Sequence, residues 1–354
     1  MGTPASTYDY RLPEERIAQR PLAERDASRL LHLRVDGTLE DRRFLDLPEL
    51  LAPGDLLVVN DTRVRAARLR GTRPGGGGAE VLLLSRLPGE GARFAALVRP
   101  ARRLPPGTVV EVGEGLAVTV GTALPGHPGS RAVEVVAAGD VDAAVERAGT
   151  VPLPPYIREA LGDPGRYQTL FSASARPESA AAPTAGLHFT PRVMAALDRR
   201  GVAVARVRLE VGLATFSPIR ATTVEDHEMH EERIELPESA ADAVAAARAR
   251  GGRVVAVGTT AARVLESRRS DGGLVEPGAG TTRLYLRPGN PPRVVDGLLT
   301  NFHQPRSSLL VLLASLVGER WRPAYEHAMT AGYRFLSFGD CMLCWRQGPV
   351  GERR

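Results

Sequence analysis

The sequence has little cysteine, few aromatic residues and no long hydrophobic run. Its two cysteines, Cys341 and Cys344, are too few for a disulfide framework and fit a reducing compartment. The most apolar run, SSLLVLLASLV, has 11 residues, which is too short to cross a bilayer. The N-terminal residues contain no apolar signal region. These absences predict a cytoplasmic protein with no membrane segment.

Three common enzyme motifs are also missing. The sequence contains no G-x-S-x-G word, no Walker A motif and no dinucleotide-binding fingerprint, which removes several large enzyme classes. The net charge of +5 and the pI of about 9.7 are a mild basic excess. That excess is compatible with a nucleic-acid partner but does not identify one.

The 354 residues, of which 43% are hydrophobic, are enough for two domains with substantial cores. Five short β-type runs between residues 62 and 136 are separated by Gly/Pro turns, which predicts an all-β barrel or sandwich. Strand and helix patterns alternate on either side of this region. We therefore predict the α/β class: a discontinuous, open barrel-like α/β domain (1–62 plus 150–354) with an inserted β-barrel domain (63–149).

The stretch APTAGLHFT precedes a clear helix start, with Thr190 as N-cap and Pro191 at the first position. Gly201 stands where the glycine that ends this helix is expected. A helix N-terminus offers free N–H groups to a carboxylate, a phosphate or a ribose oxygen. His188 would stand beside such a ligand and could act as acid or base. The alternative is that His188 bonds a neighbouring carbonyl beside the cap, and this stretch alone slightly favours it.

Two other strand-to-helix turns carry polar residues. In VVAVGTTAARVLES, Gly258, Thr259 and Thr260 would expose N–H groups and hydroxyls to a ligand ahead of a helix that begins at Ala261, although an ordinary capped turn explains them equally well. In NFHQPRSS, Asn301 and His303 stand just before an apolar helix whose expected N-cap is Ser307.

Two segments have the composition of metal sites. EDHEMHEER places His227 and His230 among carboxylates, but it does not match H-E-x-x-H, and a polar surface segment is the preferred interpretation. The single C-x-x-C of CMLC lies in an apolar stretch, which favours core packing. We predict no metal site.

Taken in order, several words of the sequence resemble the S-adenosylmethionine:tRNA ribosyltransferase-isomerase family of queuosine biosynthesis. The resemblance covers essentially the whole chain, and PTAGLHFT and TNFH are its most specific words. The full set is YDYRLPEERIAQRPLAERDASRLL, LLVVNDTRV, VPLPPYI, RYQTLFS, AAPTAGLHFT, VGLATFSPI, GTTAARVLES, VDGLLTNFHQPRSSLL and AGYRFLSFGDCML.

The resemblance implies a largely monomeric cytoplasmic enzyme with an α/β domain and an inserted β-barrel. Its reaction would transfer and isomerise the ribosyl part of S-adenosylmethionine. The acceptor would be the aminomethyl group of preQ1 at the tRNA wobble position, and the products epoxyqueuosine-tRNA, adenine and methionine. S-adenosylmethionine would be a co-substrate, with no other cofactor and no metal.

The resemblance also implies the site residues. His188 is the first choice for acid/base work and His303 the second. Arg263 would contact the carboxylate of the substrate and Asp340 an amine. The substrate-binding set is Thr184, Gly186, Thr259, Thr260, Arg263, Asn301 and Asp340.

The sequence departs from the family pattern at several positions, which keeps two alternatives open. One is a diverged paralogue that uses S-adenosylmethionine on another nucleoside or amine. The other is a silent RNA- or nucleoside-binding protein of the same fold. The departures are Ala214 in place of a glycine, Ser217 in place of an arginine, Ala261 and Ala262 after GTT, Arg233 and Ile234 in place of two tyrosines, and Phe94 in place of a tryptophan.

Overall fold

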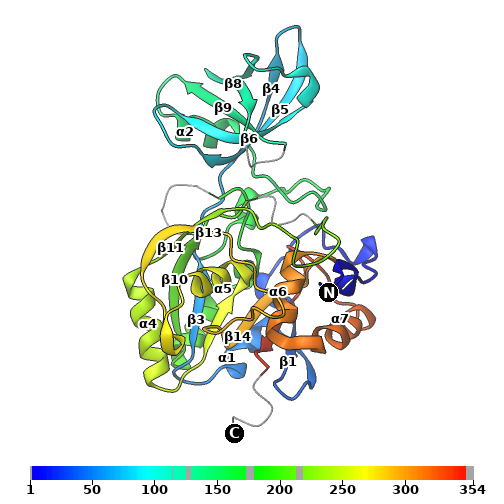
Figure 1. Cartoon of the computed structure of the whole chain (residues 1–354), viewed down its shortest axis with the longest axis vertical. Coiled ribbons are helices and arrows are strands. Elements are labelled where there is room, and N and C mark those ends of the chain that lie inside the picture. The colour runs from blue at the N-terminus through cyan, green and yellow to red at the C-terminus, as the bar shows by residue number, and fades with distance from the viewer. Residues whose placement is uncertain (1, 114, 125–128, 173–178, 213–217, 348–354) are drawn as a thin grey trace. The chain divides into compact units, whose positions relative to one another are not determined.

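The computed structural model describes residues 2–113, 115–124, 129–172, 179–212 and 218–347. The chain forms two compact units (Figure 1). One contains Met1–Thr62, Pro154–Ala175 and Pro183–Arg354, and the other contains Arg63–Leu153 and Arg176–Ala182. The second unit therefore includes a short return segment that the predicted boundaries assigned to the first.

The second unit is a closed β-barrel with strand order β4-β5-β6-β9-β8-β7. All of its strand pairs are antiparallel, and alternate residues such as Val118, Val120, Val133 and Val135 are buried. Helix α2 (Val141–Ala148) packs on β8 and β9. The strands are β4 (Arg68–Arg73), β5 (Gly77–Arg86), β6 (Arg93–Arg99), β7 (Val109–Gly113), β8 (Leu116–Ala123) and β9 (Arg131–Ala137).

The first unit is built on a nine-stranded mixed sheet of order β13-β11-β10-β3-β12-β14-β15-β1-β2. The four central strands β10, β3, β12 and β14 are parallel, and β15 runs antiparallel to β14. This bears out the predicted α/β class with a β-barrel. The strands are β1 (Arg29–Leu33), β2 (Leu39–Arg43), β3 (Leu56–Asn60), β10 (Ala203–Leu209), β11 (Glu232–Leu236), β12 (Val254–Val257), β13 (Gly278–Thr282), β14 (Gly297–Asn301) and β15 (Cys341–Trp345).

Helices cover both faces of this sheet. Leu57 and Val59 of β3 belong to a core cluster with Val193 and Leu197 of α3 (Pro191–Arg199), beside α1 (Leu47–Leu50). Helices α4 (Glu238–Ala249) and α5 (Gly258–Ser267) contact the same strands but contribute nothing to that cluster, so they lie on the opposite face. Helix α6 (Ser308–Val317) contacts β15, and α7 (Trp321–Thr330) contacts β1.

The predicted helix ends are confirmed. Thr190 caps α3 by accepting the N–H of Val193, and Ser307 caps α6 in the same way. Gly201 follows α3 with φ of 73°, a conformation that favours glycine. The helix after β12 begins earlier than predicted, at Gly258, whose φ of 85° makes the turn out of the strand.

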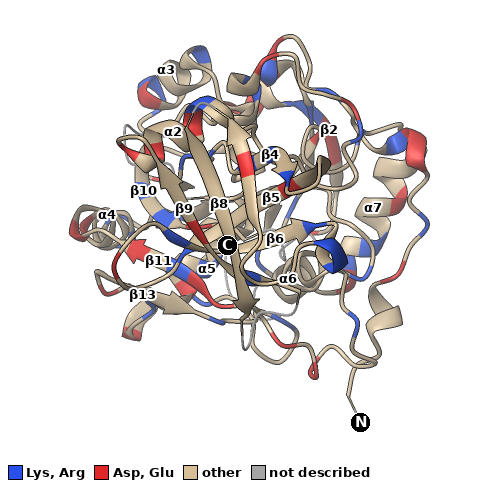
Figure 2. Cartoon of the chain, turned by 90° about the horizontal axis from the view of Figure 1, so that it is seen from above, with Lys and Arg blue, Asp and Glu red and all other residues tan. Residues whose placement is uncertain are grey.

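Charges of both signs are distributed over the helices. Figure 2 shows basic and acidic segments interspersed on α3 and α7. Within the described part of the chain, no helix is long and apolar enough to span a membrane.

Candidate functional site

The carboxyl ends of the parallel strands meet at one edge of the sheet, which we call the carboxyl edge. The strands β3, β12 and β14 end there, at Asn60, Val257 and Asn301. From β3 the chain continues to β10 on one side and later to β12 on the other side. Open α/β sheets bind ligands at the carboxyl edge where successive connections diverge in this way.

Four polar side chains form a hydrogen-bonded group at this edge, which we call the His188 network. Thr184 Oγ1, in the 3₁₀ helix η7 (Thr184–His188), donates to Asn301 Oδ1 at 2.8 Å. Asn301 Nδ2 lies 3.2 Å from His188 Nε2. On the other side of the ring, His188 Nδ1 lies 3.0 Å from Ser28 Oγ. The network thus joins η7, the end of β14 and the residue before β1.

The donors and acceptors fix the proton on His188. Ser28 Oγ donates to the carbonyl of Arg25 at 2.9 Å, so it accepts from His188 Nδ1–H. Nε2 then carries the lone pair of the ring, which accepts from the Asn301 amide. Burial, together with the nearby positive charge of Arg334, lowers the pKa of His188 to about 4. His188 is therefore a neutral imidazole whose basic nitrogen faces Asn301.

His303 lies outside the His188 network. Its Nε2 is 3.0 Å from Thr300 Oγ1, and its backbone N–H donates to the hydroxyl of Tyr325 at 2.9 Å. The Tyr10 hydroxyl donates to its carbonyl. Burial lowers the pKa of His303 to about 3. These contacts fix the segment between β14 and α6.

The low pKa values of His188 and His303 predict sensitivity to acid. Both pKa values are lower in the folded chain than the ordinary 6.5, so unfolding takes up protons below pH 6.5 and stability falls as the pH decreases toward 4. Each histidine contributes about 1.4 kcal/mol per pH unit in this range. In His303→Gln, the slope of unfolding free energy against pH between 6 and 4 should decrease by about that amount. Denaturant unfolding at several pH values measures it, and an unchanged slope would contradict it.

Several hydroxyl groups close to this edge are buried without a partner. Thr259 and Thr260 lie in the first turn of α5, and both are buried. The hydroxyls of Thr62, Thr169 and Thr260 have no hydrogen-bond partner among the described residues. Buried polar atoms are normally satisfied by protein, water or ligand, so these hydroxyls indicate a place for one.

The structure gives three predicted site residues other partners. Gly186 was expected to admit a ligand, but a Cβ there would lie 3.0 Å from the Thr169 side chain, so the glycine lets η7 approach Thr169. Arg263, predicted to contact a substrate carboxylate, forms a buried ion pair with Glu232 through Nη1, and its Nη2 has no hydrogen-bond partner among the described residues.

Asp340 was expected to contact an amine. Its carboxylate instead accepts the backbone N–H groups of Arg29 at 3.0 Å and Arg334 at 2.8 Å. Its backbone carbonyl accepts from Asn301 at 3.4 Å. Asp340 therefore supports the His188 network through the backbone.

Sequence reasoning did not single out Ser28, Thr62 or Thr169. Thr62 lies two positions after the strand word LLVVN, and Ser28 directly precedes a strand, so position at a strand end was the available signal. Thr169 lies outside any strand or helix and gives no such signal.

Among the described residues, which include both segments with metal-like composition, no three His, Cys, Asp or Glu side chains are grouped so that they could hold a metal ion. The ring of His227 packs edge-on against Tyr285. Cys341 and Cys344 are free and buried in β15, as core packing predicted.

The departures from the family pattern fall mostly in the core. Ala261 and Ala262 are buried in α5, Ile234 is buried in β11, and Phe94 is buried in the barrel. Ala214 and Ser217 lie outside the described residues.

Comparison with known proteins identifies a family. The family model described as "Queuosine biosynthesis protein" matches residues 5–344. The S-adenosylmethionine:tRNA ribosyltransferase-isomerase of Pelotomaculum thermopropionicum is 49% identical over 96% of this chain and 98% of its own. That of Gloeobacter violaceus is 51% identical over 95% of this chain and 94% of its own. The crystal structure of S-adenosylmethionine tRNA ribosyltransferase from Thermotoga maritima is 34% identical, covers 95% of this chain and 99% of its own, and has a TM-score of 0.54.

Proposed function

This chain belongs to the queuosine biosynthesis family, and we propose that its carboxyl edge is where S-adenosylmethionine donates its ribosyl group to tRNA. The chain is an enzyme of the ribosyltransferase-isomerase type, as its full-length similarity to enzymes of that name supports. The acceptor we propose is the aminomethyl group of preQ1 at the wobble position. The products would be epoxyqueuosine-tRNA, adenine and methionine. We expect a cytoplasmic monomer that needs no further cofactor.

The reaction needs a base beside the sulfonium. The positive sulfur acidifies the C5′ protons, so a proton acceptor must reach that carbon. His188 is neutral and carries its lone pair on Nε2, which makes it the better candidate for this step. Its low pKa keeps it unprotonated throughout the physiological range. His303 remains the second candidate, although its contacts are those of a residue that fixes the backbone.

Other groups at the carboxyl edge suit the rest of the substrate. The unpartnered hydroxyl of Thr260, with Thr259, lies at the start of α5, where backbone N–H groups favour an anion such as the methionyl carboxylate. The Thr184 hydroxyl and the Asn301 amide can exchange their mutual bond for bonds to ribose hydroxyls. Arginines flanking a splayed wobble base would contact RNA phosphates.

The observation that carries the proposal is the directed His188 network at the carboxyl edge. The test is to incubate the protein with S-adenosylmethionine and preQ1-bearing tRNA and to assay adenine and epoxyqueuosine. Both products are expected. Adenine without modified tRNA would indicate a paralogue with another acceptor. Neither product, with S-adenosylmethionine still bound, would indicate a silent binding protein.

Ser28 is expected to act as a positioning residue for His188. In Ser28→Ala the buried Nδ1–H loses its acceptor, which costs about 1–3 kcal/mol and removes the preference for the Nδ1–H tautomer. We expect kcat to fall by about tenfold while the KM for S-adenosylmethionine changes little. Steady-state kinetics measure this split, and the ¹⁵N shifts of the His188 ring report the tautomer. Ser28→Thr keeps the hydroxyl and should restore the tautomer; a kcat of Ser28→Ala equal to the wild type would contradict the role.

A further inference from the structure

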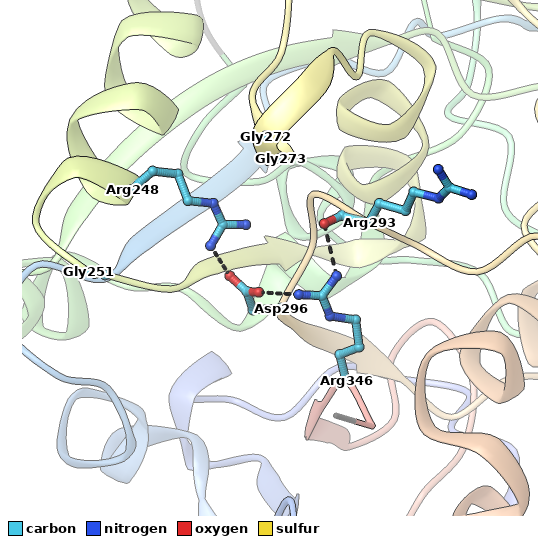
Figure 3. A pocket seen from close by; sticks show the side chains of 8 residues that line it. Arg248, Gly251, Gly272, Gly273, Arg293, Asp296 and Arg346 are labelled. Carbon is cyan, nitrogen blue, oxygen red and sulfur yellow. Dashed lines mark hydrogen bonds and ion pairs between the residues drawn. The ribbon is translucent and has the colours of Figure 1, made fainter. Parts of the chain in front are cut away.

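A second polar cluster lies at the amino edge of the parallel strands, opposite the His188 network. It surrounds a cavity of about 350 Å³ between the end of α4, the segment 272–273, the start of β14 and the end of β15 (Figure 3). This volume is in the lower part of the range for small-molecule sites. We call it the arginine cavity; it is lined by Arg248, Gly251, Gly252, Gly272, Gly273, Arg293, Asp296 and Arg346.

The acceptors of the arginine cavity are already occupied. Asp296, its one carboxylate, is buried and bonds to both Arg248 and Arg346. One of its oxygens also accepts the backbone N–H of Val254 at 2.9 Å. The carbonyl of Arg293 accepts from Arg346 Nη1 at 2.9 Å. Asp296 is therefore held as the anchor of two arginines and is not available to a cation.

Two carbonyls at the end of α4 already have partners. The carbonyls of Ala247 and Arg248 accept the N–H groups of Gly252 at 2.8 Å and Gly251 at 3.0 Å. These bonds occupy two of the acceptors that a helix C-terminus otherwise presents.

Donors, in contrast, are in excess. A guanidinium has five N–H groups. Arg248 uses its two Nη atoms to donate to Asp296 and to the carbonyl of Val294, and Arg346 uses its two Nη atoms to donate to Asp296 and to the carbonyl of Arg293. Figure 3 shows both side chains directed at Asp296, while that of Arg293 extends away from it. The exposed guanidinium of Arg293 bonds to none of the residues that the structure describes. Three arginines and one aspartate give the lining residues a net charge of +2.

Glycines leave the rest of the wall bare. Gly251 and Gly272 have φ of 72° and 70°, and a Cβ on either would meet no atom within 4 Å. At these two glycines the backbone itself borders the cavity, so a ligand can approach the main chain closely.

We propose that the arginine cavity binds a phosphate group. Guanidinium groups present N–H pairs that match phosphate oxygens, and a phosphate supplies both the missing negative charge and the missing acceptors. The group would be a backbone phosphate of RNA or a free phosphate compound. Because the cavity lies at the amino edge, this site is separate from the one proposed for S-adenosylmethionine and does not depend on it.

The first test is a calorimetric titration of the full chain with inorganic phosphate at constant ionic strength. We expect saturable binding to the wild type and binding about tenfold weaker in Arg346→Ala and in Arg293→Ala. The matched control is Arg250→Ala, which removes an exposed arginine near the same helix end that does not line the cavity. Thermal unfolding of each variant verifies that it is folded.

The second test identifies the source of the phosphate. Binding of tRNA is measured by fluorescence anisotropy between 50 and 200 mM salt, where losing one phosphate contact lowers the salt slope by about 1. A lower slope in Arg346→Ala would identify RNA. An unchanged slope with weakened inorganic phosphate binding would identify a free phosphate compound. If inorganic phosphate does not bind the wild type, or binds all variants equally, and the slope is unchanged, the proposal is wrong.

Discussion

Replacing His188 by alanine is expected to lower the rate of adenine release by about 10²–10⁴-fold, the usual contribution of a general acid or base. The variant removes His188 Nε2, the ring nitrogen that carries the lone pair and accepts from the Asn301 amide. Binding of S-adenosylmethionine should persist, because the hydroxyls at the start of α5 remain. Single-turnover adenine release and calorimetric binding measure the two effects separately.

The control is His32, a buried histidine of the same unit that lies outside the His188 network. His32 in β1 accepts from Trp345 Nε1 at 2.9 Å and lies 3.3 Å from Glu40, so it takes no part in the His188 network. We expect His32→Gln to leave adenine release within a few-fold of the wild type. Undiminished adenine release in His188→Ala would remove His188 from the chemistry.

Replacing Arg263 by methionine is expected to destabilise the protein by about 3–5 kcal/mol, because it leaves a buried carboxylate without its partner. Arg263 and Glu232 are both buried, with side chains 4% and 6% exposed. Burial lowers the pKa of Arg263 to about 10, which shows how far the site is from water. Denaturant unfolding measures the loss.

The double variant Arg263→Met with Glu232→Met separates charge from packing. Removing both charges should recover most of the lost stability, since buried ion pairs replaced by apolar residues are often nearly neutral. If Arg263→Met alone is as stable as the wild type, the pair has no structural role, and a substrate contact for Arg263 becomes the better interpretation.

Local signals in the sequence predicted most of the fold. Caps at Thr190 and Ser307, the glycine at 201 and the β-type runs of the barrel all act over a few residues, so the sequence displays them directly. Strand β4 was not predicted, because RLRGTR lacks apolar alternation and is fixed by pairing with β5 and β7.

The candidate site was predicted less completely, because it depends on residues far apart in the chain. His188 and Asn301 were singled out from their own turns, but Ser28, 160 positions before His188, comes to it only through the sheet order. The ion pair of Arg263 with Glu232 was not predicted either, because the sequence does not show that β11 places Glu232 beside Arg263. Thr169 was not predicted because it lies outside any strand or helix and comes close to the site only in the folded chain.

Locating the binding site of S-adenosylmethionine tests the proposed function most directly. A crystal structure with S-adenosylhomocysteine, which lacks the reactive sulfonium, locates the ribose without turnover. We predict that the ribose lies at the carboxyl edge, within hydrogen-bond reach of the His188 network, with the amino-acid end at Thr259 and Thr260. A ribose bound in the arginine cavity, or anywhere away from the carboxyl edge, would contradict the account.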